Sequence, residues 1–133
     1  MIDVENQIIT KVSDAVKVSY PNIFVTSVDV ITEQDIPCIV IAQTDNRVRT
    51  DMTDSGDLEN GVISTVEITA YSNTPDTARS EAKAILALAD TAMKAMGYTR
   101  VTMLALPTTN VTVCRMFARY EATVDKNELT YRR

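Results

Sequence analysis

The residue types that usually carry catalysis are scarce or poorly spaced in this chain. Histidine is absent, which removes the commonest general base and the usual ligand of zinc and iron sites. Cys38 and Cys114 stand 76 positions apart, which excludes a CxxC motif. Gly56 and Gly61 flank the sequence DLEN without a GxGxxG or GxxxxGK[ST] pattern, so nothing indicates a phosphate-binding loop. We therefore expect a protein that is not an enzyme and that holds no metal or other cofactor.

Acidic residues cluster in residues 43–61, the one long region without a strong hydrophobic period. It carries five acidic against two basic residues, a local net charge of −3. The aspartates could in principle bind calcium or magnesium, but their spacing does not match DxDxDG, so a solvated loop is the simpler interpretation. Two shapes remain open: a long hairpin whose arms at 47–52 and after Leu58 extend the flanking strands, or an arm that reaches a neighbouring subunit or a partner.

Length, charge and hydropathy indicate a single globular domain and argue against nucleic-acid-binding, secreted and membrane proteins. The 133 residues, 45% of them hydrophobic, suit one domain spanning 1–133 around one core. The net charge of −5 and the lack of a basic run argue against sequence-specific binding of nucleic acid. The N-terminus is acidic where a secretory signal needs basic residues, and no apolar run is long enough to span a membrane. We expect synthesis in the cytosol, no membrane partner and two reduced cysteines.

Residues 74–97 predict a long helix with both ends marked. Pro75 suits the first helical turn, Thr74 or Asn73 can cap it, and Gly97 supplies the left-handed residue that commonly closes a helix. Its apolar residues recur at steps of three and four and are mostly small: Ala78, Ala82, Ile85, Leu86, Ala89, Met93 and Met96. A helix with this small-residue stripe can pack closely against a sheet.

A second helix is predicted over 2–19, where it ends before Pro21. The expected strands are 24–31, 37–43, 62–71, 98–106 and 111–124. The strand at 37–43 is apolar on both faces, which indicates a central position. Together these patterns predict an α+β fold of order α-β-β-β-α-β-β. Its mixed or antiparallel sheet of about five strands carries two helices on one face, a long arm between the second and third strands, and a tail at 125–133.

Two of the strands show which residues share a face. Phe24, Val28 and Val30 are predicted on one side of the first strand, which is half exposed. The last strand alternates most clearly, with its inward face formed by Cys114, Met116, Ala118, Tyr120, Ala122 and Val124. Its outward face is formed by Arg115, Phe117, Arg119 and Glu121.

The outward face of the last strand and the acidic arm are candidate contact surfaces. From Arg115 onward the chain holds five basic and three acidic residues, a local +2 against the −3 of the arm. Such a chain favours head-to-tail contacts, which close into a ring if the rotation permits, although an ordinary mixed surface is the alternative. The candidate subunit or partner interface comprises Arg47, Arg49, Asp51, Asp54, Asp57, Glu59, Arg115, Arg119, Tyr131, Arg132 and Arg133.

The element order, the helix opened by TPDTARSEA and the end FARYEATVDKNELTYRR resemble the small tail terminator proteins of long-tailed bacteriophages. These are also called tail completion or tail-to-head joining proteins. The resemblance implies a structural protein that forms a homo-hexameric ring on the tail tube protein, ends tube polymerisation and offers a surface to the head connector protein. It places the protein in the host cytoplasm during assembly and at the head-proximal end of the virion tail afterwards.

The same resemblance implies a role for the arm at 43–61, which would correspond to a hairpin facing a neighbour or the tube. The acidic balance would suit a lumen through which DNA slides. Two alternatives remain open: another neck or baseplate component of a phage tail, or a small-molecule-binding regulatory domain.

Overall fold

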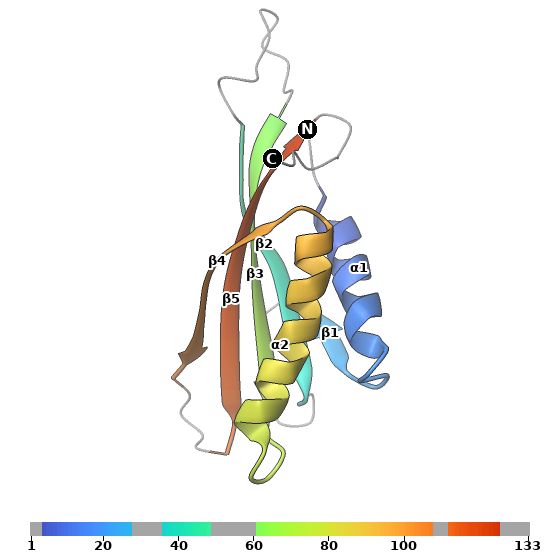
Figure 1. Ribbon diagram of the computed structural model, residues 1–133, viewed down its shortest axis with the longest axis vertical. Helices are drawn as coiled ribbons and strands as arrows, with labels where there is room; N and C mark the ends of the chain where they lie inside the picture. Colours follow the sequence, from blue (N-terminus) through green and yellow to red (C-terminus); the bar gives the residue numbers. More distant parts are fainter. Residues whose placement is uncertain (1–3, 28–35, 49–60, 108–111, 126–133) are drawn as a thin grey trace, which may run out of the picture.

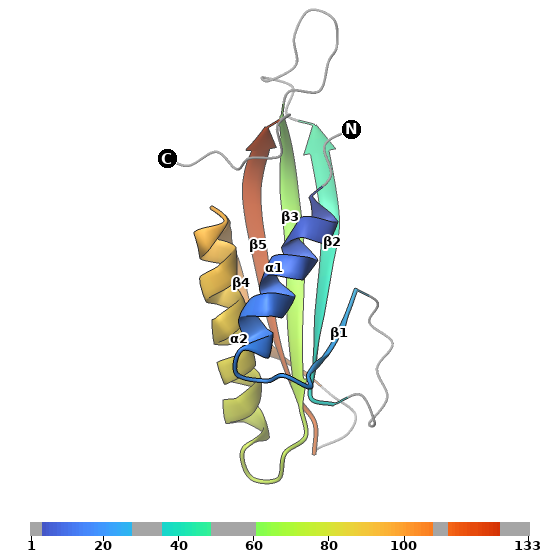
Figure 2. The same ribbon diagram turned by 90° about the vertical axis from the view of Figure 1, so that its right-hand side faces the viewer.

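The chain forms one sheet with both helices packed against the same face (Figures 1 and 2). The computed structural model describes residues 4–27, 36–48, 61–107 and 112–125. In chain order the elements are α1 (Glu5–Lys17), β1 (Phe24–Thr26), β2 (Cys38–Val48), β3 (Gly61–Ser72), α2 (Ala78–Ala95), β4 (Thr99–Leu106) and β5 (Cys114–Asp125). The predicted α+β class, element order and number of strands are confirmed.

The five strands lie in the order β1-β2-β3-β5-β4. β1 runs parallel to β2, and the other neighbours are antiparallel, so the sheet is mixed. The ladder between β2 and β3 extends to the pair Val48 and Val62, so β2 continues past its predicted end at residue 43. The remainder of the predicted arm, residues 49–60, and most of the predicted tail, residues 126–133, lie outside the described residues.

The core lies between the helices and the sheet. α1 buries Ile8, Val12 and Val16, which recur every four residues along one face of the helix. Of its predicted small-residue stripe, α2 buries Ala82, Ile85, Leu86, Ala89 and Met93, whereas Ala78 and Met96 are half-buried. The sheet contributes alternate residues of its two longest central strands: Val62, Val66, Ile68 and Ala70 from β3, and Met116, Ala118, Tyr120 and Val124 from β5. Neither described helix has the length and hydropathy needed to cross a bilayer.

The two ends of α2 differ in how well the sequence predicted them. At the C-terminus Gly97 adopts φ 89°, and Tyr98 N–H donates to the Met93 carbonyl at 3.0 Å, which confirms the expected glycine closure. At the N-terminus the prediction is wrong, because the helix begins at Ala78 and Pro75 lies in the preceding turn. Asp76 takes φ 65° in that turn, and a left-handed residue interrupts a helix.

The hydroxyl that was expected to cap α2 has another partner. Thr74 Oγ1 and Ser72 Oγ both donate to Glu81 Oε1, at 3.0 and 2.8 Å. Thr77 occupies the cap position without a side-chain hydrogen bond to the helix. The Glu81 carboxylate in the first turn of α2 therefore links the helix to the end of β3. No side-chain hydroxyl of the described residues caps the helix.

β1 also turns a different face to the core than expected. Val25 packs against the core, while Phe24 is 43% exposed. The parallel register with β2 explains this, because it sets Phe24 beside Cys38, whose side chain lies on the sheet face opposite the helices. Val28 and Val30 lie outside the described residues. A smaller apolar cluster of Cys38, Val40 and Tyr71 covers part of that opposite face.

Candidate assembly surface

Strand β4 presents an apolar edge to solvent. It is the last strand of the sheet, and among the described strands only β5 pairs with it. Val101, Met103 and Leu104 are 54%, 44% and 42% exposed. Charged residues are absent from 101–106, although sheet edges are commonly protected by charges against pairing with another chain. An exposed, uncharged edge of this kind is a candidate site for another strand.

The apolar side chains flank the β4 backbone on both sides of the sheet. The register places Met103 beside Ala118, on the face covered by the helices, and Leu104 beside Phe117 on the opposite face. A bulge between Arg100 and Thr102 leaves Val101 without a partner in the ladder. A strand that paired with β4 would therefore find apolar contacts above and below its hydrogen bonds.

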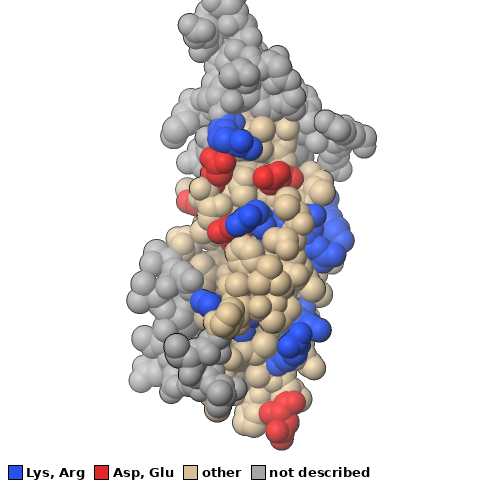
Figure 3. Space-filling model, turned by 90° about the vertical axis from the view of Figure 1, so that its left-hand side faces the viewer, with Lys and Arg blue, Asp and Glu red and all other residues tan. Residues whose placement is uncertain are grey.

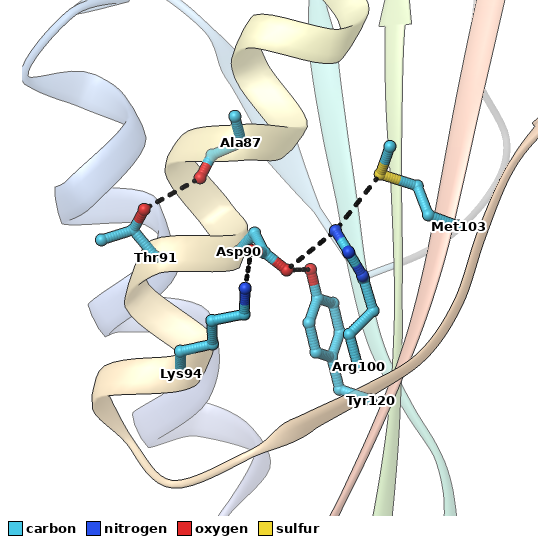
Figure 4. A network of polar contacts seen from close by, with 7 residues as sticks. All are labelled: Ala87, Asp90, Thr91, Lys94, Arg100, Met103 and Tyr120. Atoms are coloured by element: carbon cyan, nitrogen blue, oxygen red, sulfur yellow. Dashed lines mark hydrogen bonds and ion pairs between the residues drawn. The ribbon is translucent and has the colours of Figure 1, made fainter.

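A polar network fixes the start of β4 to helix α2 (Figure 4). Asp90 Oδ1 accepts a hydrogen bond of 2.7 Å from the Tyr120 hydroxyl. Its other oxygen lies 2.9 Å from Lys94 Nζ, and Arg100 Nη1 lies 3.6 Å from Oδ1. The same Arg100 nitrogen reaches Met103 Sδ at 3.7 Å. One carboxylate thus joins α2, β5 and the edge strand.

The environment keeps both acidic groups of the network in a single charge state. Burial on its own raises the pKa of Asp90, but the hydrogen bond from Tyr120 and the charges of Lys94 and Arg100 outweigh it and lower the pKa. Burial and the hydrogen bond to the Asp90 carboxylate raise the pKa of Tyr120 well above its ordinary value. Near neutral pH Asp90 is thus ionised and Tyr120 is neutral. Through these fixed charge states the network links α2, β5 and the start of β4.

The predicted outward residues of β5 lie on the sheet face away from the helices, where they make contacts within the chain. Figure 3 shows this face, with acidic and basic side chains interspersed in its upper half and, below them, an uncharged area flanked by basic side chains. Arg119 Nη2 and Nε donate to Glu67 Oε2 at 2.7 and 2.9 Å, and its guanidinium lies over the Phe117 ring. Arg115 Nη2 donates to the Pro107 carbonyl at 2.8 Å and lies over Tyr71.

Of the predicted interface residues, the three that the structure describes are Arg47, Arg115 and Arg119, and they do not form one cluster. Arg47 lies near the end of β2, where its Nε is 3.0 Å from Asp45 Oδ2, and one strand, β3, lies between it and the strand that carries Arg119. Eight further predicted residues lie outside the described part of the chain: Arg49, Asp51, Asp54, Asp57, Glu59, Tyr131, Arg132 and Arg133.

The exposed β4 edge was missed by sequence reasoning. The strand itself was predicted at 98–106, but its position in the sheet was not, since strand order does not follow from local pattern. The uncharged run VTMLAL was the available signal. This run is apolar on both faces, which is typical of a buried strand. It is exposed because β4 is the last strand of the sheet and pairs with β5 on one side only among the described strands.

An open cleft of about 600 Å³ lies between the turn before α2 and the start of β5. Residues 73–76, Ala78, Arg79 and 112–114 line it. Asp76 and Arg79 are its charged residues, and both are exposed, so the cleft lacks the buried, convergent polar groups typical of a ligand site. The described ranges also contain no group of three or more carboxylate or cysteine side chains that could hold a metal ion.

The chain was compared with protein-family models and with curated proteins. No protein-family model matches the chain, and no curated protein matches it significantly.

Proposed function

We propose that this protein is a structural subunit that assembles with copies of itself, and that it forms the ring which caps a bacteriophage tail tube. The exposed apolar edge of β4 carries the first part, because a monomeric protein with such an edge would be prone to uncontrolled strand pairing. The resemblance of the element order and chain end to tail terminator proteins supports the second part. In this role the ring is a hexamer that ends tube polymerisation and offers a head-joining surface.

The scarcity of catalytic residue types supports an assembly role over an enzymatic one. The strongest polar network, around Asp90, holds ionised and neutral partners in fixed states and joins three elements. The arginines of the outer face are engaged by Glu67 and Pro107. The partners we propose are the tail tube protein on one side of the ring and the head connector protein on the other. The protein would act in the host cytoplasm and remain at the head-proximal end of the tail.

The test is the mass of the purified protein, measured by light scattering over a range of concentrations with and without tail tube protein, followed by negative-stain imaging. We expect rings of six copies, alone or on tube ends, and tubes that stop growing when the protein is added. A protein that forms rings but binds the baseplate end of the tail would favour another neck or baseplate role. A chain that stays at 14.7 kDa under all these conditions, and whose melting temperature rises with a small molecule, would support the regulatory-domain alternative instead.

A further inference from the structure

We infer that β4 of one copy pairs antiparallel with the outer edge of β2 in the next copy, so that the copies join head to tail into one continuous sheet. The inference rests on the proposal that copies of this chain associate, and it names the two surfaces that meet. It does not depend on which virion component the ring binds.

The receiving edge lies on the opposite side of the same sheet. β1 pairs only with Cys38, Ile39 and Val40 at the start of β2, which leaves residues 41–48 without a strand on their outer side in the described structure. That stretch has eight residues, the same length as β4. One of its amides, Gln43 N–H, donates to the Glu5 carboxylate at 2.9 Å, and a strand that paired at this position would replace that hydrogen bond.

Strand direction suits such a pairing. β2, β3, β5 and β4 are antiparallel at each step, so β4 runs opposite to β2. Copies related by rotation about a ring axis to which the strands are tilted would therefore bring antiparallel edges together, the arrangement with the better hydrogen-bond geometry.

The registers also set the offset between the copies. They place Thr99 level with Asp45 and Leu106 level with Cys38. Matching β4 to residues 41–48 of the next copy thus needs an offset of three residues along the strands, about 10 Å. A sheet that closes into a ring accommodates such an offset by tilting its strands relative to the ring axis.

The distribution of charge favours a second copy of this chain as the partner of β4. The stripe of α2 that faces β4 and the start of β4 carry four basic residues and one acidic residue: Arg79, Lys83, Lys94, Arg100 and Asp90. This basic side has a net charge of +3, and because the whole chain carries −5, the rest of the molecule carries −8. The receiving edge of a second copy also carries a net negative charge among its described residues, because Glu5 and Asp45 outnumber Arg47 there.

The same charges disfavour a symmetric dimer through β4. A two-fold axis at this edge would set the α2 helices of the two copies side by side on one face of the sheet, with their basic sides facing each other. Like charges at such a contact oppose association. The two-fold dimer would also use both β4 edges and could not grow into a ring.

Two variants that each block one edge test the inference. Val101→Lys with Leu104→Lys places two charges on the β4 edge, and Thr44→Lys with Asp45→Lys does the same on the β2 edge, where both residues are exposed. The control is Val18→Lys, which makes the same apolar-to-Lys change at a residue 83% exposed at the end of α1. The masses of the wild type, each variant, the control and a 1:1 mixture of the two variants are measured by sedimentation.

Head-to-tail pairing predicts a particular pattern of masses. Each edge variant alone should sediment at 14.7 kDa, the mixture should form a dimer of twice that mass and nothing larger, and the control should assemble like the wild type. Dimers in the mixture also show that both variants are folded, because each supplies the intact edge that the other lacks.

Other patterns overturn the inference in distinguishable ways. A β2-edge variant that still dimerises on its own would show that β4 pairs with itself. Variants that both assemble like the wild type would exclude these edges while leaving the proposed ring in place. A wild type that remains monomeric up to about 1 mM, with and without tube protein, would reject self-assembly and with it this pairing.

Discussion

Tyr120 should contribute more to stability than its size suggests, because its hydroxyl anchors the edge strand through Asp90. The side chain is fully buried, and its 2.7 Å hydrogen bond goes to a carboxylate that is only 14% exposed. A hydrogen bond to a charged group contributes about 1.5–3 kcal/mol. Asp90 keeps Lys94 at 2.9 Å after the change, so Tyr120→Phe should lower the free energy of unfolding by about 1.5–2 kcal/mol at neutral pH.

The pH dependence separates this mechanism from a general loss of packing. Because the pKa of Asp90 is lowered on folding, its ionised form stabilises the protein above the ordinary pKa of about 3.9, and this contribution is lost as pH falls through the folded value. The cost of Tyr120→Phe should therefore shrink in acid towards that of a neutral hydrogen bond, about 1 kcal/mol.

Tyr98→Phe is the matched control, because it removes a buried hydroxyl that donates to Ser64 Oγ, a neutral acceptor, at 2.9 Å. Its cost should not depend on pH in the acidic range. The assay is urea denaturation of the wild type and both variants between about pH 3 and pH 7. A Tyr120→Phe variant that loses less than about 0.5 kcal/mol at neutral pH, or the same amount at both ends of the range, would refute the reasoning.

Two further predictions concern the end of α2 and the alkaline range. Gly97→Ala should lower the free energy of unfolding by about 1–2 kcal/mol in urea denaturation, because alanine strains the left-handed backbone at φ 89°; an unchanged midpoint would contradict the closure described for α2. The raised pKa values of Tyr98 and Tyr120 stabilise the protein below the ordinary tyrosine pKa of about 10, and this contribution is lost as pH rises above it. Thermal melts should therefore fall steeply above about pH 10 in the wild type and less steeply in Tyr120→Phe; parallel curves would contradict this.

Periodicity was sufficient to predict the helices and the best strand. The small-residue stripe of α2 and the alternation of β5 each record which side chains face the core. The structure buries most of those residues and half-buries Ala78, Met96, Cys114 and Ala122. The first strand shows where such a pattern fails. Phe24 is the more hydrophobic choice for the core, but the parallel pairing with β2 turns Val25 inward, and the partner strand is not visible in the local sequence.

The candidate site at the β4 edge also depends on which strands lie side by side, which the local sequence does not show. β5 inserts between β3 and β4, although β4 precedes it in the chain, and only this order leaves β4 at the edge. The Asp90 network likewise joins residues 30 positions apart. The sequence did identify Arg115 and Arg119 as outward residues of β5, but their contacts with Pro107 and Glu67 could not be inferred from alternation alone.

The central claim is that copies of the chain meet at the β4 edge, and amide hydrogen exchange measured across a range of protein concentrations tests it most directly. At low concentration the amides of 99–106 that do not pair with β5 should exchange quickly. We expect them, together with amides of 41–48, to become protected as concentration rises, while exchange in β3 and β5 stays unchanged. Assembly that protects other segments and leaves β4 exchanging at its dilute rate would contradict the claim.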